Sequence, residues 1–391
     1  MGLRIAVMMT SDCVAFVAAP YGFGPASKAI AISSHLPRAI RRVFFGDGPS
    51  LDLARASCEF STCTSLDFDT PAQSVANILS PYGTLVFVNS TRFLTLSSKT
   101  GASVVFVDTL AWTRGTRPSQ LPTLSAYFAQ RFFDHDFAAE LESARSFHAT
   151  GAIVPRAFAE PRDQRRISKR PPIVHCGGLY SPAMRPGADE AFVTQICRML
   201  NETGLPMRVM LPKHLHTQFM AQAAAGVSLI DCSPINAMWH IQDSPFALTT
   251  SGIEFTYESV LLGVPTLFLP PFNATQLLQL NYYRHLFEGC VPFLLDHGMR
   301  HSTSQSLDAD TAVIQERGMT GAWTTQFDTL GQYLRTSVLG GFPDTLTALR
   351  RQQQRAISNV GMDGANTIAL HIVSDIENGK GDRWSCPDTS K

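Results

Sequence analysis

The stretch 243–283 constrains the fold more than any other part of the sequence. It contains two short apolar runs, Pro245–Leu248 and Thr266–Leu269, with an amphipathic segment at Ile253–Leu262 between them. Apolar runs of about four to eight residues that are bounded by turn residues are typical of buried parallel strands. The stretch therefore predicts a strand, a Gly turn, a helix, a Gly-Val-Pro stop and a second strand, followed by a Pro-Pro turn and a polar loop.

The turn between the first strand and the helix is suited to bind an anion. Ser251 and Gly252 are small, the first N–H groups of a helix have no partner within it, and the helix dipole is positive there. Glu258 lies about two helical turns after Ser251, so both can face the same side. A phosphate near the turn and a sugar hydroxyl near Glu258 are geometrically compatible. An ordinary strand-turn-helix unit with a surface Glu explains the same residues.

The segment SGIEFTYESVLLGVPTLFLPPFNATQ resembles the donor-site signature of GT-B nucleotide-sugar glycosyltransferases. Those enzymes carry a Ser-Gly or His-Gly-Gly turn, a Glu in the following helix, a Gly-Xaa-Pro stop and a polar pair after the next strand. The resemblance implies that the amides from Ser251 to Ile253 bind a diphosphate and that Glu258 holds the ribose hydroxyls. It also implies that Thr275 and Gln276 orient the sugar.

Length and composition limit the class of protein. A chain of 391 residues, 45% hydrophobic and 16% charged, favours two globular domains. The formal net charge is zero, which disfavours a nucleic-acid partner held by bulk charge. No signal-peptide pattern opens the chain, no apolar run reaches the ~18 residues that span a bilayer, and the eight cysteines form no CxxC pair. We expect a cytoplasmic protein with reduced thiols and no transmembrane segment.

The first half of the chain alternates apolar runs with helical patterns, which predicts an α/β sheet. The segment YGFGPASKAIAIS, Tyr21–Ser33, is similar to the glycine-rich first loop and helix of GT-B acceptor domains, which implies that Phe23, Gly24 and Ser27 lie on the acceptor side. Many of those enzymes have a His beside these glycines, and this chain has none there. A tight turn into a helix explains the same loop. The expected strands are Arg4–Met9, Arg42–Phe45, Thr84–Val88 and Ser103–Val107, and the expected helices are Ala26–Leu36 and Pro71–Leu79.

A general base is needed if the acceptor is a neutral hydroxyl group. Asp108 directly follows the predicted strand at Ser103–Val107 and is the first candidate, with capping of the next segment as its alternative role. Asp12 lies just past the first predicted strand and is the second candidate. The cluster 134–136 (Asp-His-Asp) is the third, and a solvated surface loop explains it as well.

A second domain is expected to begin at Ile173, after a basic, Pro-containing linker at 155–172. Its first strand runs into Gly177 and Gly178, which lack side chains and permit close backbone approach to a diphosphate. GT-B enzymes place a glycine-containing loop here. By position in the resemblance, Ser233 and Ile235 belong to the loop that pairs with the nucleotide base, although Ser-Pro as a simple helix start also explains them.

The resemblance implies an α/β fold with two Rossmann-like domains that face each other across a cleft, the GT-B architecture. The N-terminal acceptor-binding domain is expected at 1–154 and the nucleotide-sugar-binding domain at 173–340. C-terminal helices at 341–377 are expected to pack back across both domains, and 378–391 is expected to be a disordered tail.

The implied activity is transfer of a sugar from a UDP- or dTDP-sugar to a small-molecule acceptor, such as a natural product, with no cofactor. No predicted strand is followed by an Asp-Xaa-Asp motif, and His214 and His216 have no ligand-rich partner segment, so no metal site is expected. Two alternatives remain open. One is a nucleotide-sugar epimerase or hydrolase that uses no separate acceptor, and the other is a catalytically silent sugar-nucleotide binder.

Overall fold

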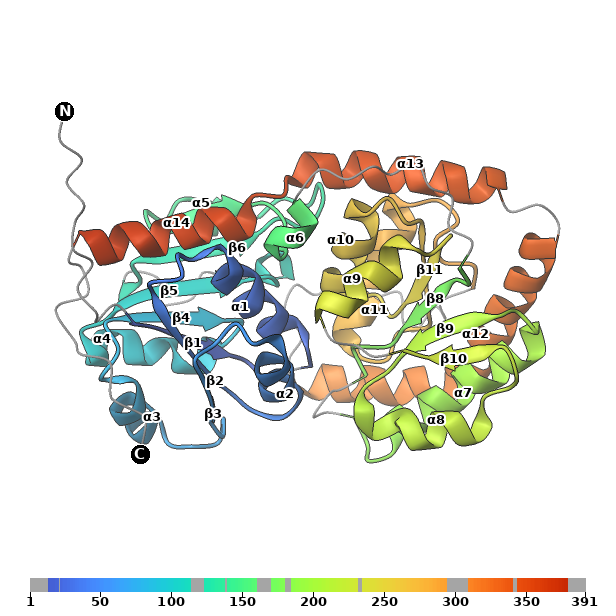
Figure 1. The fold of residues 1–391 in the computed structure, drawn as a ribbon, viewed down its shortest axis with the longest axis horizontal. Coiled ribbons are helices and arrows are strands. Elements are labelled where there is room, and N and C mark those ends of the chain that lie inside the picture. The colour runs from blue at the N-terminus through green and yellow to red at the C-terminus, as the bar shows by residue number, and fades with distance from the viewer. Residues whose placement is uncertain are drawn as a thin grey trace. The chain divides into compact units, whose positions relative to one another are not determined.

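The computed structural model describes residues 13–20, 22–113, 123–137, 139–159, 170–179, 184–230, 234–293, 309–339 and 343–378. The chain divides into two compact units. Unit 1 comprises Met1–Pro20, Pro25–Ala159 and Val360–Lys391, and unit 2 comprises Tyr21–Gly24 and Glu160–Asn359. The chain therefore passes from unit 1 into unit 2 and returns to unit 1 with its last helix (Figure 1).

Unit 1 is built on a seven-stranded parallel sheet with the strand order β3-β2-β1-β4-β5-β6-β7. Its strands are β1 (Cys13–Ala18), β2 (Arg41–Gly46), β3 (Thr62–Ser65), β4 (Thr84–Val88), β5 (Ser103–Asp108), β6 (Ala126–Gln130) and β7 (Phe147–Thr150). The described helices and 3-10 turns are α1 (Gly24–His35), α2 (Gly48–Ser57), α3 (Ala72–Leu79), η1 (Thr91–Leu96), α4 (Ser97–Thr100), η2 (Ala111–Thr113), α5 (Ala139–Glu142), α6 (Arg156–Ala159) and α14 (Gly364–Glu377).

Both faces of the unit 1 sheet are covered. One face packs against α1, α2 and α14, and the buried apolar side chains of α14 are Ala365, Ile368, Ala369 and Ile372. The other face packs against α3 and η1. Because both faces are covered, the central strands β1, β4 and β5 are buried along their whole length, which is why their sequences are continuous apolar runs without alternation.

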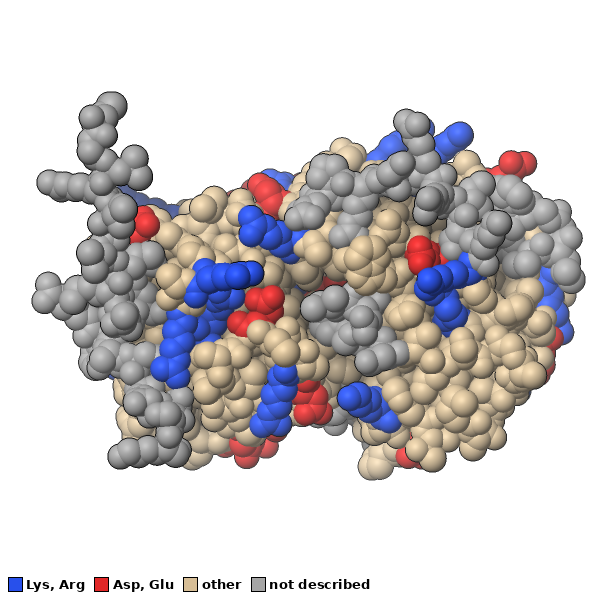
Figure 2. All heavy atoms as spheres, in the orientation of Figure 1, with Lys and Arg blue, Asp and Glu red and all other residues tan. Residues whose placement is uncertain are grey.

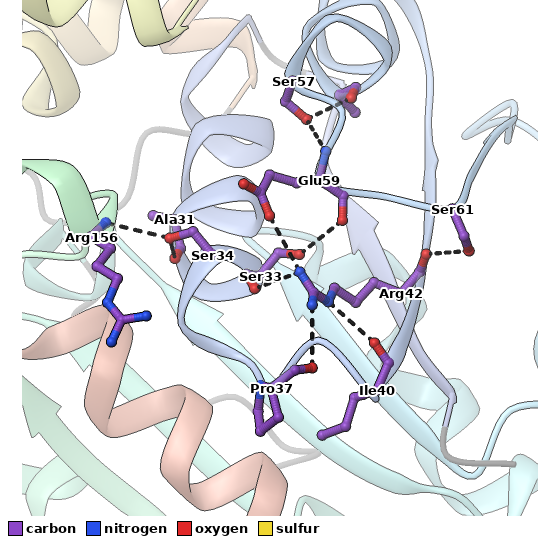
Figure 3. A network of polar contacts seen from close by, with 11 residues as sticks. Ala31, Ser33, Ser34, Pro37, Ile40, Arg42, Ser57, Glu59, Ser61 and Arg156 are labelled. Atoms are coloured by element: carbon purple, nitrogen blue, oxygen red, sulfur yellow. Dashed lines mark hydrogen bonds and ion pairs between the residues drawn. The ribbon is translucent and has the colours of Figure 1, made fainter. Parts of the chain in front are cut away.

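A single arginine ends α1 and fixes its connection to β2 (Figure 3). The guanidinium of Arg42 donates to the carbonyl oxygens of Ser33 (3.1 Å), Pro37 (3.2 Å) and Ile40 (3.2 Å), and it pairs with Glu59 at 3.3 Å. The last carbonyls of a helix have no partner within the helix, so these bonds satisfy groups that the turn would otherwise leave unpaired. Arg42 therefore sets the position of α1 against the sheet.

Unit 2 contains a five-stranded parallel sheet with the order β10-β9-β8-β11-β12. Its strands are β8 (Ile173–His175), β9 (Met207–Met210), β10 (Val227–Leu229), β11 (Ala247–Thr249) and β12 (Thr266–Phe268). The described helices are α7 (Ala188–Thr203), α8 (His216–Gln222), α9 (Pro234–Gln242), α10 (Ile253–Leu261), α11 (Ala274–Leu286), α12 (Ala309–Leu339) and α13 (Pro343–Val360), together with the 3-10 turn η4 (Lys213–Leu215).

The strand order of unit 2 defines where a ligand is expected. The chain runs outward from β8 to β9 and β10, and then returns to place β11 on the other side of β8. In open parallel sheets of this kind, ligands bind outside the carboxyl ends of the strands at the point where the order reverses. That point lies between β8 and β11. At the sheet edge, Gln353 of α13 exchanges hydrogen bonds of 2.9 and 2.8 Å with the backbone of Thr266 in β12.

The structure corrects two expectations and adds four strands to unit 1 that the sequence did not predict, β1, β3, β6 and β7. The residues after the Pro-Pro turn form α11 rather than a polar loop, because Asn273 accepts a hydrogen bond from the Gln276 amide and the apolar face of the helix is buried. From the sequence alone, a polar region is expected between Pro292 and a helical stretch at Thr345–Ile357. The structure instead places the long helix α12 there, whose buried positions Trp323, Phe327, Leu330 and Leu334 repeat at helical spacing. The first described strand is β1, whereas the expected strand at Arg4–Met9 lies outside the described residues.

The surface is mixed in charge. On the face in Figure 2, Lys and Arg side chains lie in small groups with Asp and Glu side chains near them. Within the described part of the chain, no helix is both long enough and apolar enough to cross a bilayer. The six described cysteines are free thiols, and four of them are buried.

Candidate functional site

The carboxyl ends of β8 and β11 lie side by side in the unit 2 sheet, because His175 pairs with Thr249 in the parallel register. The glycine turn Gly177-Gly178 follows β8, and the segment Thr250-Ser251-Gly252 leads from β11 into α10. The two segments that the sequence predicts as diphosphate-binding turns therefore lie at the reversal point of the sheet. This is the candidate site.

Gln276 of α11 ties the two turns together. Its side-chain Nε2 donates to the carbonyl of Gly178 at 3.0 Å, and its Oε1 accepts from the amide of Phe272 at 2.8 Å. The hydroxyl of Ser251 donates to the carbonyl of Gln276 at 2.6 Å. Ser251 and Gln276 are both buried, so these bonds fix the backbone of both turns. The predicted role of Gln276 in orienting a sugar stays a prediction.

The two glycines are required by packing as well as by backbone approach. A Cβ on Gly177 would lie 2.7 Å from Cε1 and Nε2 of His175, and a Cβ on Gly178 would lie 2.5 Å from Nε2 of Gln276. Real Cβ atoms almost never approach other heavy atoms this closely. Any side chain here would displace the groups that shape the site.

Thr250 is a polar residue of the site that the sequence reading did not single out. It is 2% exposed, and its Oγ1 lies 3.2 Å from the position of a Cβ on Gly178. Among the residues that the structure describes, its hydroxyl has no hydrogen-bond partner. A hydroxyl without a protein partner is available to donate a hydrogen bond to a bound ligand. Thr250 lies beside the amino end of α10, so both groups favour an anion.

His175 is the second addition to the site. Its ring stacks on Phe255 of α10, with the ring centroids 3.9 Å apart and the planes at 8°. Burial lowers the pKa of this imidazole from 6.5 to about 3. His175 is therefore neutral at physiological pH.

The depressed pKa of His175 predicts that mild acid destabilises the protein. Between about 6.5 and about 3, the unfolded state binds a proton at this residue that the native state does not, so the free energy of unfolding falls as the pH falls. From about pH 8 to about pH 5 the loss is about 2 kcal/mol. His175→Phe keeps the ring and removes the titration, so urea unfolding should show a smaller loss in the variant. An equal loss in both proteins would show that the native imidazole takes up a proton.

The remaining donor-side residues are distributed along α9, α10 and α11. Ile253 is buried at the start of α10, Glu258 is half-buried farther along the same helix, and Thr275 is half-buried in the first turn of α11. Ser233 lies outside the described residues. Ile235 lies in α9, but its side chain is outside the described part of the chain.

Two of the predicted acceptor-side residues lie in unit 2 beside the donor-side segments: Cδ2 of Phe23 is 3.5 Å from the position of a Cβ on Gly177, and Cγ of Glu254 is 3.8 Å from that of a Cβ on Gly24. Gly24 begins α1 directly after Phe23, and Ser27 is half-buried in the first turn of that helix. Asp12 lies outside the described residues, and β1 begins one residue later.

Asp108 has the geometry of a capping residue. It ends β5 and is fully buried, and its carboxylate accepts hydrogen bonds from the hydroxyl of Tyr127 at 2.8 Å and the amide of Leu110 at 3.0 Å. In the third candidate cluster, Nδ1 of His135 contacts the carbonyl of Asp136 at 2.7 Å and the ring packs edge-on against Trp112. The role of Asp108 as a base stays a prediction.

A common signal marks the site residues that the sequence reading missed. His175, Thr249 and Thr250 are polar residues at the carboxyl ends of short apolar strands, where parallel sheets place their functional groups. Asp108 is predicted from this position at the end of a strand in unit 1, and the same position at the ends of β8 and β11 predicts His175, Thr249 and Thr250. Within the described ranges, no group of three or more His, Cys, Asp or Glu side chains is placed to hold a metal ion.

The comparisons with known proteins give likeness in structure alone. The sequence matches none of the protein-family models and none of the curated proteins compared with it. UGT2 of Phytolacca americana, solved with UDP-2-fluoro-glucose and pterostilbene, is similar with a TM-score of 0.56 at 12% identity, over 95% of this chain and 100% of that one. Os79 of O. sativa, solved with UDP, is similar with a TM-score of 0.55 at 12% identity, over 92% of this chain and 99% of that one.

A third similar structure is a Listeria monocytogenes protein assigned as a UDP-N-acetylglucosamine 2-epimerase. It gives a TM-score of 0.54 at 10% identity, over 97% of this chain and 99% of that one. The likeness therefore extends over almost the full length of both chains in each case. Together with the two parallel sheets, it shows that the chain has the GT-B fold, with two Rossmann-like domains.

Proposed function

We propose that this protein transfers a glycosyl group from a nucleoside-diphosphate sugar, with UDP or dTDP as the nucleotide, to a small-molecule acceptor. The observation that carries the proposal is the hydroxyl of Thr250, a residue only 2% exposed, which has no hydrogen-bond partner among the described residues and lies beside the amino end of α10 at the reversal point of the unit 2 sheet. Solved proteins of the same fold, named for UDP-sugar transfer or crystallised with UDP, support the choice of ligand.

The proposed donor lies with its diphosphate on the amides of Ser251, Gly252 and Ile253 and on the hydroxyl of Thr250. The turn Gly177-Gly178 leaves room for the phosphates because it carries no side chains. Departure of the nucleotide leaves negative charge on the diphosphate, and fixed N–H dipoles stabilise such charge without having to reorganise. Glu258 is proposed to hold the ribose hydroxyls and Thr275 to contact the sugar. The transfer is proposed to need no metal ion.

The base that activates the acceptor is proposed to be Asp108 or Asp12, both in unit 1. Full burial and two hydrogen bonds to the protein support a structural role for Asp108. Unit 1 is proposed to bind the acceptor, since the donor groups named above all belong to unit 2.

Turnover assays test the proposal directly. The protein is incubated with UDP- and dTDP-sugars alone, then with a pool of small-molecule hydroxyl acceptors, each with and without EDTA. Glycosylated product that requires an acceptor and persists in EDTA is the expected result. Product formed without an acceptor would instead establish an epimerase or hydrolase, which the likeness to the Listeria monocytogenes protein favours. Nucleotide binding without any turnover would establish a silent binder.

Thr250→Val is expected to weaken UDP or dTDP binding about 10- to 100-fold, because it removes one hydrogen bond to a charged group without changing the shape of the side chain. Isothermal titration calorimetry measures the change. Thr329→Val, an exposed position on α12, is the matched control and should bind as the wild type does. If both variants bind with wild-type affinity, Thr250 does not contact the diphosphate.

A further inference from the structure

The hydrogen bonds around Thr249 favour one tautomer of His175. The hydroxyl of Thr249 donates to the carbonyl oxygen of Thr250 at 3.0 Å. The same hydroxyl oxygen lies 3.3 Å from Nδ1 of His175. A hydroxyl has one hydrogen, so once this hydrogen points to Thr250, the oxygen can only accept from His175. This arrangement favours the tautomer with the proton on Nδ1.

The other ring nitrogen is then a lone-pair acceptor. A neutral imidazole has one N–H and one unprotonated nitrogen, so Nε2 of His175 is unprotonated. Among the described residues, Nε2 has no hydrogen-bond partner. Since burial holds the pKa of the ring at about 3, mild acid does not protonate this nitrogen in the native state.

The position of Nε2 relates it to the donor site. Nε2 and Cε1 lie 2.7 Å from the position that a Cβ on Gly177 would occupy, so this edge of the ring borders the glycine turn. One face of the ring is covered by Phe255, and the residue as a whole is half-buried. The hydrogen-bond acceptor Nε2 of His175 thus lies at the end of β8, beside the glycine turn. The hydroxyl of Thr250 and the amino end of α10 follow the neighbouring strand, β11.

We propose that Nε2 of His175 accepts a hydrogen bond from a hydroxyl group on the sugar of the bound donor. This inference rests on the proposed function and assigns one further specificity-determining residue to it. The lone pair of Nε2 repels a phosphate oxygen and attracts a hydroxyl hydrogen. His175 therefore favours the sugar of the donor, whereas Thr250 and the end of α10 favour its diphosphate. The chain would then discriminate between sugars by the hydroxyl that meets His175.

The tautomer can be tested without any ligand. Long-range ¹H–¹⁵N correlations of the ¹⁵N-histidine-labelled full chain distinguish a protonated ring nitrogen from an unprotonated one, and His175→Asn identifies the signal by its loss. The expected result is a neutral ring with the proton on Nδ1, unchanged between about pH 8 and about pH 5. Thr249→Val removes the acceptor and should allow the other tautomer. A wild-type ring with its proton on Nε2 overturns the inference.

The ligand contact is tested by comparing UDP with UDP-glucose, and dTDP with dTDP-glucose. His175→Phe keeps the ring and lacks both nitrogens, whereas His175→Asn keeps a donor toward Thr249 and has no atom at Nε2. In both variants the affinity for the sugar nucleotide is expected to fall about 10-fold more than the affinity for the free nucleotide.

The outcomes separate this inference from the proposed function. Equal losses for nucleotide and sugar nucleotide, or no loss for either, would overturn the contact with the sugar while the donor site stands. A wild-type protein that binds neither nucleotide would overturn the proposed function instead, and the tautomer measurement would still decide the protonation of His175.

Discussion

Arg208→Ala is expected to reduce the stability of unit 2 by about 3–5 kcal/mol, the largest effect that we expect from a single substitution outside the candidate site. Arg208 lies at the start of β9 and is 6% exposed. Its guanidinium donates to the carbonyls of Pro171 (3.0 Å), His240 (2.9 Å) and Asp243 (3.3 Å), and to the hydroxyl of Ser244 (2.6 Å).

These bonds join the entry to β8 with the end of α9 and the turn before β11. Removing the guanidinium takes a donor from three partly buried carbonyls, of which that of His240 still accepts from the hydroxyl of Ser244 at 2.8 Å. It also opens a cavity at the junction, and both effects destabilise. Arg208→Lys keeps the charge, but the lysine ammonium lacks the planar guanidinium that contacts several oxygens at once. We therefore expect a loss of stability between those of the wild type and Arg208→Ala. Burial lowers the pKa of Arg208, which is consistent with a group held largely away from water.

Hydrogen exchange followed by mass spectrometry measures this effect in the full chain, because peptides of unit 1 serve as an internal reference. Protection should fall in β8, β9 and α9 and stay unchanged in unit 1. The control is Arg198→Ala, whose pair with Asp328 has side chains 36% and 51% exposed and should contribute less than about 1 kcal/mol. If the two variants lose the same protection, the buried bonds of Arg208 contribute no more than a surface ion pair.

Gly177→Ala is expected to abolish or strongly weaken donor binding, by about 100-fold or more, and to destabilise unit 2 by about 1–3 kcal/mol. The new methyl group would lie 2.7 Å from the ring of His175. The ring cannot easily move away, because it is stacked on Phe255 and bonded to Thr249. Either the ring or the turn must shift, and both shape the site.

Calorimetric titration with UDP or dTDP and thermal unfolding measure the two effects. Gly321→Ala is the matched control. A Cβ on that exposed glycine of α12 would meet nothing within 4 Å, so binding should not change, and the higher helix propensity of Ala should stabilise the helix by up to about 1 kcal/mol. Wild-type affinity in Gly177→Ala would show that the donor does not depend on this turn.

Local pattern was sufficient for much of the fold. The run around 243–283 predicted β11, α10 and β12 to within two residues, because apolar runs and Gly or Pro stops are local signals. Local pattern did not predict α11 or α12. The first turn of α11 depends on the bond from the Gln276 amide to Asn273, and the apolar positions of α12 are sparse enough to read as a polar region until their partners are known.

The sequence by itself determined that the chain has two α/β domains and that small residues and amides lie at Gly177-Gly178 and Ser251-Gly252, because glycine turns after apolar strands are fixed by neighbours in the chain. Only the tertiary structure decided which groups accompany them. Strand order placed β8 beside β11, and this pairing brought His175, Thr249 and Thr250 together from positions far apart in the sequence. The protonation of His175 depends on that contact and on burial, and neither can be read from local sequence.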